Sequence, residues 1–389
     1  MQKEKLLMTP GPTMLPPSVL EIMGRQIIHH RTSDFEETWD ELHENLKYIF
    51  QTKETVMTMC SSGTGAMEAA VVNLFSPGDK VLAVSIGAFG DRFAEIAKTF
   101  GLDVVKLAVE WGNAVNVKDI KDILLEDINM EIKGVLITHN ETSTGVTNDI
   151  EAVARITRET DRLLVVDAIS SLGGLELKMD EWGIDCVVTG SQKALMAPPG
   201  LSFIALSQKA WKAYENSRTP KFYWDLKKYR NGLEKLSENP PYTPAITTIM
   251  AQAEALRLMR QEGMDKIYKR HEKASRAVCK GVSALGLSLL PEESVSSYII
   301  TAVKCPQVNG INIDIGKVIK SLNNDYDIMV TGGQKQLKGK IFRIGHCGFF
   351  DGFDIIKTFS ALEQVLRAEG YVFVQSSGVR AVTEELFKE

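Results

Sequence analysis

The sequence predicts an α/β fold in which a mainly parallel β-sheet is flanked by helices. Between residues 56 and 190, short apolar runs typical of buried strands alternate with amphipathic stretches of helical period. Each apolar run ends in small, polar or charged residues, which places candidate site residues at the carboxyl edge of a parallel sheet. We expect strands at Val56–Met59, Val81–Ser85, Val104–Ala108, Gly134–His139, Leu163–Val166 and Cys186–Val188, and helices at Phe89–Phe100, Val117–Ile128 and Ile150–Thr160.

A smaller α+β unit is predicted at the C-terminal end. It follows a polar stretch, Arg218–Pro244, that reads as loops and short helices. Helical patterning resumes at Ile246–Gln261 and Lys266–Leu285, followed by strands at Tyr298–Val303, Ile328–Val330 and Ile341–Ile344 and helices at Asp314–Leu322 and Asp351–Glu369. The expected division is an N-terminal arm (residues 1–17), a large domain (18–262) and a small C-terminal domain (263–389).

Composition excludes several classes of protein. The 389 residues carry 45 basic and 50 acidic side chains, a net charge of −5, which argues against a nucleic-acid partner or an anionic membrane. Five scattered cysteines without a CxxC pair predict neither a disulfide framework nor a zinc site. No signal peptide, long apolar span or peroxisomal C-terminal tripeptide is recognised, so we expect a cytoplasmic protein.

One lysine and one aspartate stand at the ends of neighbouring apolar strands. Lys193 follows Cys186–Val188 within the run Gly190-Ser-Gln-Lys-Ala-Leu195, and Asp167 ends Leu163–Asp167, 193 − 167 = 26 residues earlier. A shielded lysine amine becomes a usable nucleophile. A carboxylate and an amine so placed suit pyridoxal phosphate, whose ring nitrogen the carboxylate keeps protonated and whose Schiff base the lysine forms. Taken singly, Lys193 could be a surface charge and Asp167 a helix cap or turn residue.

The segment Cys60–Ala70 predicts an anion site. It turns from the strand Val56–Met59 into a helix through hydroxyl residues and glycines, including Ser62, Gly63 and Thr64. Free amides at a helix start suit a phosphate ester. The segment lacks a P-loop lysine and the spacing of a dinucleotide fingerprint, so a nucleotide is disfavoured. A glycine-rich helix start without a ligand is the alternative.

Together these residues resemble the class V aminotransferases of the fold-type I pyridoxal-phosphate superfamily, most closely the alanine–glyoxylate and serine–pyruvate branch. The resemblance spans nearly the whole chain, in the family's order. Its motifs are Thr9-Pro-Gly-Pro-Thr13, Ser62-Gly-Thr64, His139-Asn-Glu-Thr-Ser-Thr-Gly145, Val166-Asp167, Gly190–Leu195 and Phe342-Arg-Ile-Gly345.

The resemblance implies how pyridoxal 5'-phosphate is held. The phosphate would be bound by Ser62, Gly63, Thr64 and Gln192, and the ring would be contacted by Phe89, Thr142, Asp167 and Lys193. Phe89 would stack on the ring where relatives often have tryptophan, and Thr142 would lie beside it. Asp167 would partner the pyridinium and Lys193 would form the Schiff base.

The resemblance also implies substrate and subunit contacts. Arg343 would grip the substrate carboxylate with its planar fork, and Gly11 would lie at the substrate. Thr243 resembles a threonine that a neighbouring subunit donates to the phosphate, which implies a homodimer with shared sites. Some relatives carry a tyrosine three residues earlier, where this chain has Pro240, and whether Tyr242 replaces it stays open.

The function this implies is ping-pong transamination between a small amino acid, alanine or serine, and a 2-oxo acid, glyoxylate or pyruvate, with Lys193 as the base that moves the Cα proton. Only one substrate-facing arginine is recognisable, which favours uncharged side chains. The alternatives are aminotransfer from aspartate or 2-aminoethylphosphonate, cysteine desulfuration, or a non-catalytic binding protein. The desulfurase alternative rests on Cys347, which would be the nucleophile, but the position of this residue beside a strand predicts a buried thiol.

Overall fold

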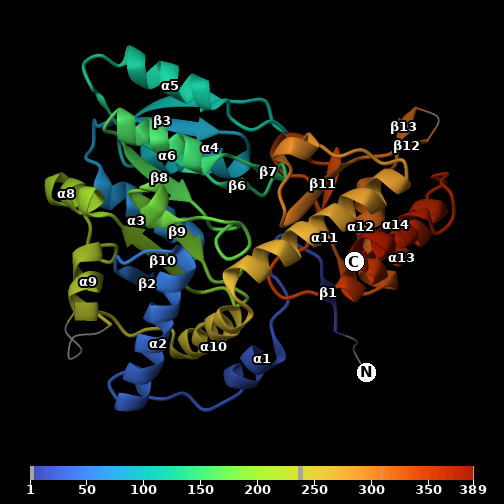
Figure 1. Ribbon diagram of the computed structural model, residues 1–389, viewed down its shortest axis with the longest axis horizontal. Coiled ribbons are helices and arrows are strands. Elements are labelled where there is room, and N and C mark those ends of the chain that lie inside the picture. Colours follow the sequence, from blue (N-terminus) through green and yellow to red (C-terminus); the bar gives the residue numbers. More distant parts are fainter. Residues whose placement is uncertain (1–3, 235–239, 309, 389) are drawn as a thin grey trace.

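The computed structural model describes residues 4–234, 240–308 and 310–388, and its larger sheet has seven strands (Figure 1). Its strand order is β2-β10-β9-β8-β5-β3-β4. β3, β4, β5, β8 and β9 run parallel, and β10 is antiparallel to both its neighbours. The strands are β2 (Val56–Met59), β3 (Lys80–Ser85), β4 (Asp103–Ala108), β5 (Ile132–Thr138), β8 (Leu163–Asp167), β9 (Cys186–Gly190) and β10 (Ser202–Leu206).

Helices cover both faces of this sheet, because strands such as β8 and β9 are buried along their whole length and need an apolar cover on either side. One face packs against α2 (Ser33–Phe50), α5 (Val117–Glu126), α6 (Ile150–Glu159) and α10 (Ile246–Glu262). The other packs against α3 (Gly63–Leu74), α4 (Ala88–Thr99), α8 (Gln208–Asn216) and α9 (Leu226–Glu234). The prediction of an α/β fold with a mainly parallel sheet is confirmed.

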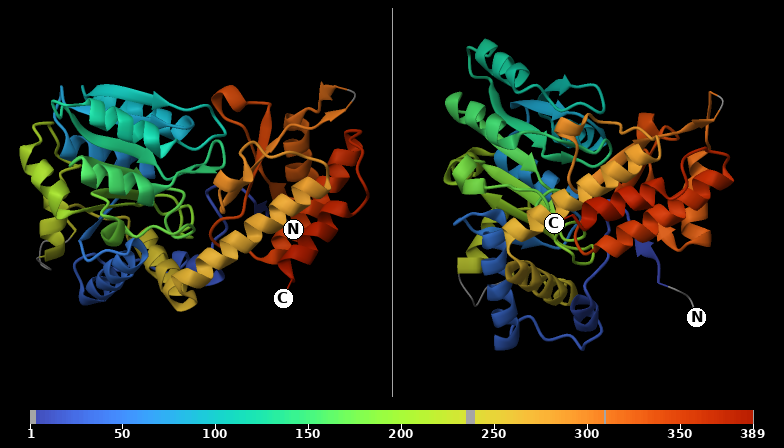
Figure 2. Two further views of the ribbon diagram at one scale, coloured as in Figure 1. Left: turned by 45° about the horizontal axis from the view of Figure 1, so that its top comes forward. Right: turned by 45° about the vertical axis from the view of Figure 1, so that its right-hand side comes forward.

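A second, three-stranded sheet lies toward the C-terminal end, in the order β11-β16-β15 with antiparallel pairing. It comprises β11 (Ile300–Lys304), β15 (Thr331–Gly332) and β16 (Ile341–Gly345), and it packs with α11 (Met264–Ala284), α12 (Ile315–Asp325), α13 (Gly352–Ala368) and α14 (Ser377–Leu386). In both views of Figure 2, α11 extends from the end of α10 into the C-terminal unit. The domain boundaries stay a prediction, although α10 ends and α11 begins on either side of Gly263.

The remaining elements are short. α1 is Pro17–Met23 and α7 is Met179–Trp182, and two 3-10 turns lie at Glu293–Val295 and Lys335–Leu337. Two-stranded ladders join β6 (Asn140–Glu141) to β7 (Val146–Thr147) and β12 (Gln307–Val308) to β13 (Ile311–Asn312). Within the described ranges no helix is both long and apolar enough to cross a membrane.

The predicted strand at Ile328–Val330 forms as a two-residue strand, Ile328–Met329. β14 (Ile328–Met329) pairs in parallel with β1 (Leu6–Leu7) of the N-terminal arm, and Thr331–Gly332 continues as β15 in the three-stranded sheet. β10 was not predicted at all. It follows the Pro198-Pro199-Gly200 turn, which returns the chain antiparallel to β9.

Candidate active site

A cavity of about 220 Å³ opens at the carboxyl ends of the parallel strands. Eight of the predicted site residues line it: Ser62, Gly63, Thr64, Phe89, Thr142, Asp167, Gln192 and Lys193. The structure therefore brings together residues that lie as much as 193 − 62 = 131 positions apart in the chain. Arg92, Asn140, Ile169 and Ser170 complete the lining and were not predicted.

Lys193 lies in the turn that follows β9. Its Nζ donates a hydrogen bond to the carbonyl oxygen of Pro10 at 2.9 Å, and Thr13 Oγ1 donates to the Lys193 carbonyl oxygen at 3.2 Å. Burial lowers the pKa of the Lys193 amine, and the charge of Arg343 lowers it further. A lowered pKa increases the fraction of neutral amine, the form that attacks a carbonyl and accepts a proton.

Gly11, predicted at the substrate, lies directly against Lys193. A β-carbon at Gly11 would fall 2.2 Å from Lys193 Cδ and 2.7 Å from Nζ, and its φ of +129° is a conformation that residues with a side chain rarely adopt. Only glycine lets the N-terminal arm cross the lysine stem at this distance.

Asp167 is the last residue of β8 and is 2% exposed. Its carboxylate accepts hydrogen bonds from Ile169 N at 2.9 Å and Thr138 Oγ1 at 3.3 Å. Burial raises its pKa to about 6. Within the described residues it forms no ion pair, so a protonated ring nitrogen would supply the direct cationic partner that this buried carboxylate lacks.

The start of α3 forms the opposite corner of the cavity. Ser62 is the N-cap residue, and its side chain makes no capping hydrogen bond. The side-chain oxygen of Gln192 is buried without a hydrogen-bond partner among the described residues. A β-carbon at Gly190 would lie 3.3 Å from Gly63 N, so the turns after β2 and β9 approach closely here. Amides at a helix start and an unsatisfied side-chain amide suit a phosphate group.

Glu141 is a buried residue of the site that sequence reasoning did not single out, although it lies inside a motif. Its carboxylate accepts hydrogen bonds from the backbone N–H groups of Phe89 and Gly90, each at 3.1 Å, and from Ser143. Burial raises its pKa. Glu141 therefore holds the first turn of α4, and with it the ring of Phe89, at the cavity wall.

Arg343, on β16 of the second sheet, does not itself line the cavity but contacts Thr142, which does. It is 3% exposed. Nε and Nη2 donate to the carbonyl oxygen of Gly332 at 3.0 and 2.7 Å, and Nη1 donates to that of Thr142 at 2.8 Å. Burial lowers its pKa to about 10. No carboxylate pairs with it in the described part of the chain, and three of its five N–H groups are used, so two remain for an anion.

Two further predictions concern residues outside the cavity. Thr243 lines a separate small pocket with Cys60, Tyr223 and Tyr242, where the Tyr242 hydroxyl donates to the carbonyl oxygen of Phe222. Thr243 thus does not meet Lys193 within one chain, and its predicted role across a subunit boundary stays a prediction. Cys347 is 5% exposed, and burial raises its pKa to about 12. The prediction of a buried thiol is confirmed.

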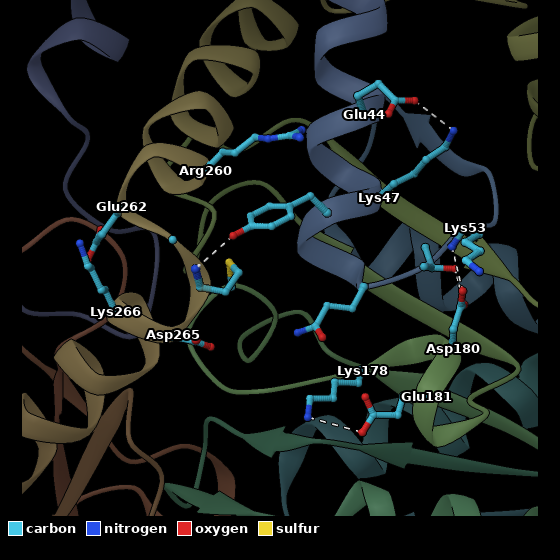
Figure 3. A pocket seen from close by; sticks show the side chains of 15 residues that line it. Glu44, Lys47, Lys53, Lys178, Asp180, Glu181, Arg260, Glu262, Asp265 and Lys266 are labelled. Atoms are coloured by element: carbon cyan, nitrogen blue, oxygen red, sulfur yellow. Dashed lines mark hydrogen bonds and ion pairs between the residues drawn. The ribbon is translucent and has the colours of Figure 1, made fainter.

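A larger pocket, of about 1030 Å³, lies elsewhere, between α2, α7 and the α10–α11 junction (Figure 3). Two ion pairs join charged residues of its lining, Lys47–Glu44 and Lys178–Glu181, and Met264 N donates to the Tyr48 hydroxyl. None of the predicted site residues lines it. Its size reflects an open, solvated groove, so the smaller cavity is the candidate active site.

The fold and the Lys193–Asp167 pair define a pyridoxal-phosphate-dependent enzyme. Residues 6–379 match the family model for class V aminotransferases, so the chain belongs to that family. It is 41% identical to the soluble hydrogenase small subunit of Synechococcus sp. (strain PCC 6716), over 99% of both chains. It is 36% identical to the serine–glyoxylate aminotransferase of Methylorubrum extorquens, over 98% of this chain and 95% of that one. The ureidoglycine–glyoxylate aminotransferase of Bacillus subtilis superposes with a TM-score of 0.93 at 29% identity, over 99% and 98%.

Proposed function

We propose that this aminotransferase moves an amino group between a small amino acid, serine or alanine, and glyoxylate. The observation that carries the proposal is the buried guanidinium of Arg343 beside the cavity-lining residue Thr142, with two N–H groups that form no hydrogen bond to the described residues. A planar fork with free N–H groups binds one α-carboxylate in bidentate fashion. Both the donor and the acceptor of such a reaction carry that group.

The size of the cavity supports small substrates. A space of about 220 Å³ has to hold the cofactor as well as the substrate, which is less than a drug-sized ligand site usually offers. Glyoxylate is the acceptor named for both aminotransferases compared above, whereas their donors differ. We therefore assign the acceptor from the relatives and the donor from the size and charge of the cavity.

When bound, pyridoxal 5'-phosphate supplies a carbonyl that takes up the amino group and a ring that accepts electrons from the substrate Cα. Asp167 holds a proton at the ring nitrogen. Lys193 would supply the amine nucleophile and, as a neutral amine, would move the proton at Cα. Arg343 fixes the substrate carboxylate, and Phe89 and Thr142 flank the ring. Ser62, Gly63, Thr64 and Gln192 hold the phosphate.

We further propose that the active unit is a cytoplasmic homodimer in which Thr243 of each chain completes the site of the other. The placement of Thr243 away from Lys193 within one chain supports this arrangement. In an isologous pair both sites are completed together.

Two other activities have less support. Desulfuration requires a thiolate nucleophile, whereas burial holds the pKa of Cys347 near 12 and keeps it protonated. A hydrogenase name, as printed for the Synechococcus relative, implies metal-centred redox chemistry. Within the described ranges no group of three or more His, Cys, Asp or Glu side chains is placed to hold a metal ion.

A donor and acceptor panel on the purified holoenzyme tests the proposal. Serine and alanine with glyoxylate should give the highest kcat/KM, followed by pyruvate as acceptor. Aspartate, whose second carboxylate meets no second buried arginine among the described residues that line the cavity, should react at least tenfold more slowly, and so should 2-aminoethylphosphonate, which carries a phosphonate and no α-carboxylate. Faster turnover of aspartate, or release of alanine and sulfur from cysteine, would replace the proposed substrates.

A further inference from the structure

Arg92 is a charged residue at the cavity that none of the roles above uses. It lies in the first turns of α4, is exposed to solvent and lines the cavity. Its Nη1 donates a hydrogen bond to Thr64 Oγ1 at 3.2 Å, and its Cζ lies 4.9 Å from the centroid of the Phe89 ring. The guanidinium therefore lies between the start of α3 and the Phe89 ring.

The charge of Arg92 is not neutralised by a neighbouring carboxylate. Within the described residues Arg92 takes part in no ion pair. The adjacent carboxylate, Asp91, is engaged instead by Lys106 at 2.6 Å, by Lys335 at 3.6 Å and by the Ser85 hydroxyl. Because Asp91 is satisfied on the other side of the helix turn, the guanidinium of Arg92 is available to an external anion.

Arg92 faces the corner of the cavity that is formed by the start of α3. Ser62 caps α3 without a side-chain hydrogen bond, and Thr64 is the second residue of the helix. Helix-start amides carry only a partial positive charge, whereas a phosphate ester carries close to two negative charges at neutral pH. The lining residues include two cations, Arg92 and Lys193, and Lys193 Nζ is directed to Pro10 at the other end of the cavity.

We propose that Arg92 binds the phosphate group of the cofactor, as the cationic partner of the amides and hydroxyls at the start of α3. The proposal rests on the pyridoxal-phosphate chemistry given above and adds a residue to it. Arg92 would hold the phosphate through charge-assisted hydrogen bonds. By lying on the face of Phe89, it would also keep the Phe89 ring and the phosphate-binding residues at the start of α3 in a fixed relative position.

Cofactor affinity in the absence of turnover tests this role. Apo-protein is titrated with pyridoxal 5'-phosphate and, separately, with pyridoxal, which lacks the phosphate, while tryptophan fluorescence and near-visible absorbance are followed. Arg92→Gln should weaken pyridoxal 5'-phosphate binding about tenfold, a typical loss for one partly exposed charge-assisted contact. Binding of pyridoxal should not change. The loss should be larger at low ionic strength, where charges are less screened.

Two further variants complete the test. Lys98→Gln removes an exposed cation from the last turn of the same helix and should leave both affinities unchanged. Arg92→Lys keeps the charge without the fork and should recover part of the affinity. Far-UV circular dichroism and melting temperature verify that each variant is folded.

The outcomes separate the possible roles. Equal weakening of pyridoxal and pyridoxal 5'-phosphate by Arg92→Gln would mean that Arg92 acts only through Phe89, and would overturn the proposal. Unchanged affinity for both would do the same. Unchanged cofactor affinity with a raised KM for dicarboxylic donors would assign Arg92 to the substrate instead. Failure of the wild-type protein to bind pyridoxal 5'-phosphate would overturn the proposed function itself.

Discussion

Arg343 donates a hydrogen bond from Nη1 to the carbonyl oxygen of Thr142 at 2.8 Å, across 201 positions of sequence. Arg343 belongs to the second sheet and Thr142 to the loop after β6 beside the first. The residue proposed to hold the substrate carboxylate is thus itself held by a backbone group at the ring side of the cavity. Substrate binding and the relative position of the two sheets are linked through this contact.

Replacing Arg343 with lysine keeps the charge but removes the two-pronged geometry. The loss of one charge-assisted contact is worth roughly 1.5 to 3 kcal/mol, so KM for both the amino acid and the oxo acid should rise about ten- to hundredfold. Arg162→Lys is the matched control, because Arg162 is equally buried but pairs with Asp127 at 2.9 Å far from the cavity. The control should lower the melting temperature and leave KM unchanged. If Arg343→Lys behaves in the same way, Arg343 is only structural.

Gly11→Ala should suppress turnover by displacing Lys193. The new β-carbon would overlap the lysine stem, 2.2 Å from Cδ, so the side chain of Lys193 has to move. We expect kcat to fall at least a hundredfold, since a shift of about 1 Å at the reacting group has effects of this order. Gly78→Ala is the control for backbone strain alone, with a φ of +88° and nothing within 4 Å of its β-carbon. Equal effects of the two substitutions on kcat would argue against a steric role for Gly11.

Lys193→Ala removes the nucleophile and the base together, and steady-state turnover should fall by at least three orders of magnitude. Cofactor should still be retained through its phosphate contacts, as equilibrium dialysis would measure. Added methylamine should restore part of the activity, whereas it should not affect Lys212→Ala on the surface of α8. Turnover near the wild-type rate in Lys193→Ala would refute the assignment.

Asp167→Asn should stabilise the protein when the cofactor is absent. The folded-state pKa of Asp167, about 6, exceeds the usual value of 3.8, so the folded state binds this proton more tightly than the unfolded state does. The contribution of Asp167 to stability is therefore full below about pH 4 and is lost as pH rises through 6. Two pKa units correspond to about 3 kcal/mol.

Thermal melts of cofactor-free protein from pH 4 to pH 8 measure this effect. The asparagine variant should melt above the wild type at pH 8, and the difference should shrink toward pH 4. Transamination by the same variant should fall by orders of magnitude, because a neutral amide does not hold a proton on the ring nitrogen. A variant that transaminates normally would leave Asp167 as a structural residue.

A mixture of two inactive variants tests the shared site. Thr243→Glu should expel the cofactor from the neighbour's site by placing a carboxylate beside its phosphate, and Lys193→Ala inactivates its own chain. After denaturation and refolding together, half of the dimers are mixed and each has one intact site, so about a quarter of wild-type activity should return. No recovery, or a fully active monomer by light scattering, would contradict shared sites.

The site residues that could be predicted from the sequence are those that stand next to a recognisable strand or helix start. Asp167 and Lys193 follow apolar runs that form β8 and β9, and the glycines and hydroxyls before α3 mark a helix start. Arg92 and Glu141 carry no such signal. Arg92 occupies a helix position that reads as a solvated face, and it becomes a cavity residue only because α3 and α4 lie side by side. Glu141 in isolation reads as a surface acid, and only the fold supplies the N–H groups of Phe89 and Gly90 that make its burial tolerable.

Prediction of the sheets was limited in the same way, because only strands with a clear local sequence pattern could be recognised. Buried parallel strands were recognisable from continuous apolar runs. β10 is apolar as well, but it directly follows a turn rich in proline and glycine and was not recognised as a strand. The partner of β14 could not be predicted, because a two-residue strand has no periodicity and its pairing is decided by packing across the whole chain.

The pairing of β1 with β14 also sets the order in which the molecule can be completed during synthesis. Leu6 pairs with Ile328, so the strand that leaves the ribosome first lacks its partner until 328 − 6 = 322 further residues have been made. The large sheet can assemble long before that point, since its strands end at Leu206. Pro10 and Gly11, four to five residues beyond the start of β1, are anchored beside Lys193 only once that pairing forms. Nascent chains stalled before residue 328 should therefore carry a folded large sheet in which Lys193 is not yet covered by Pro10 and Gly11.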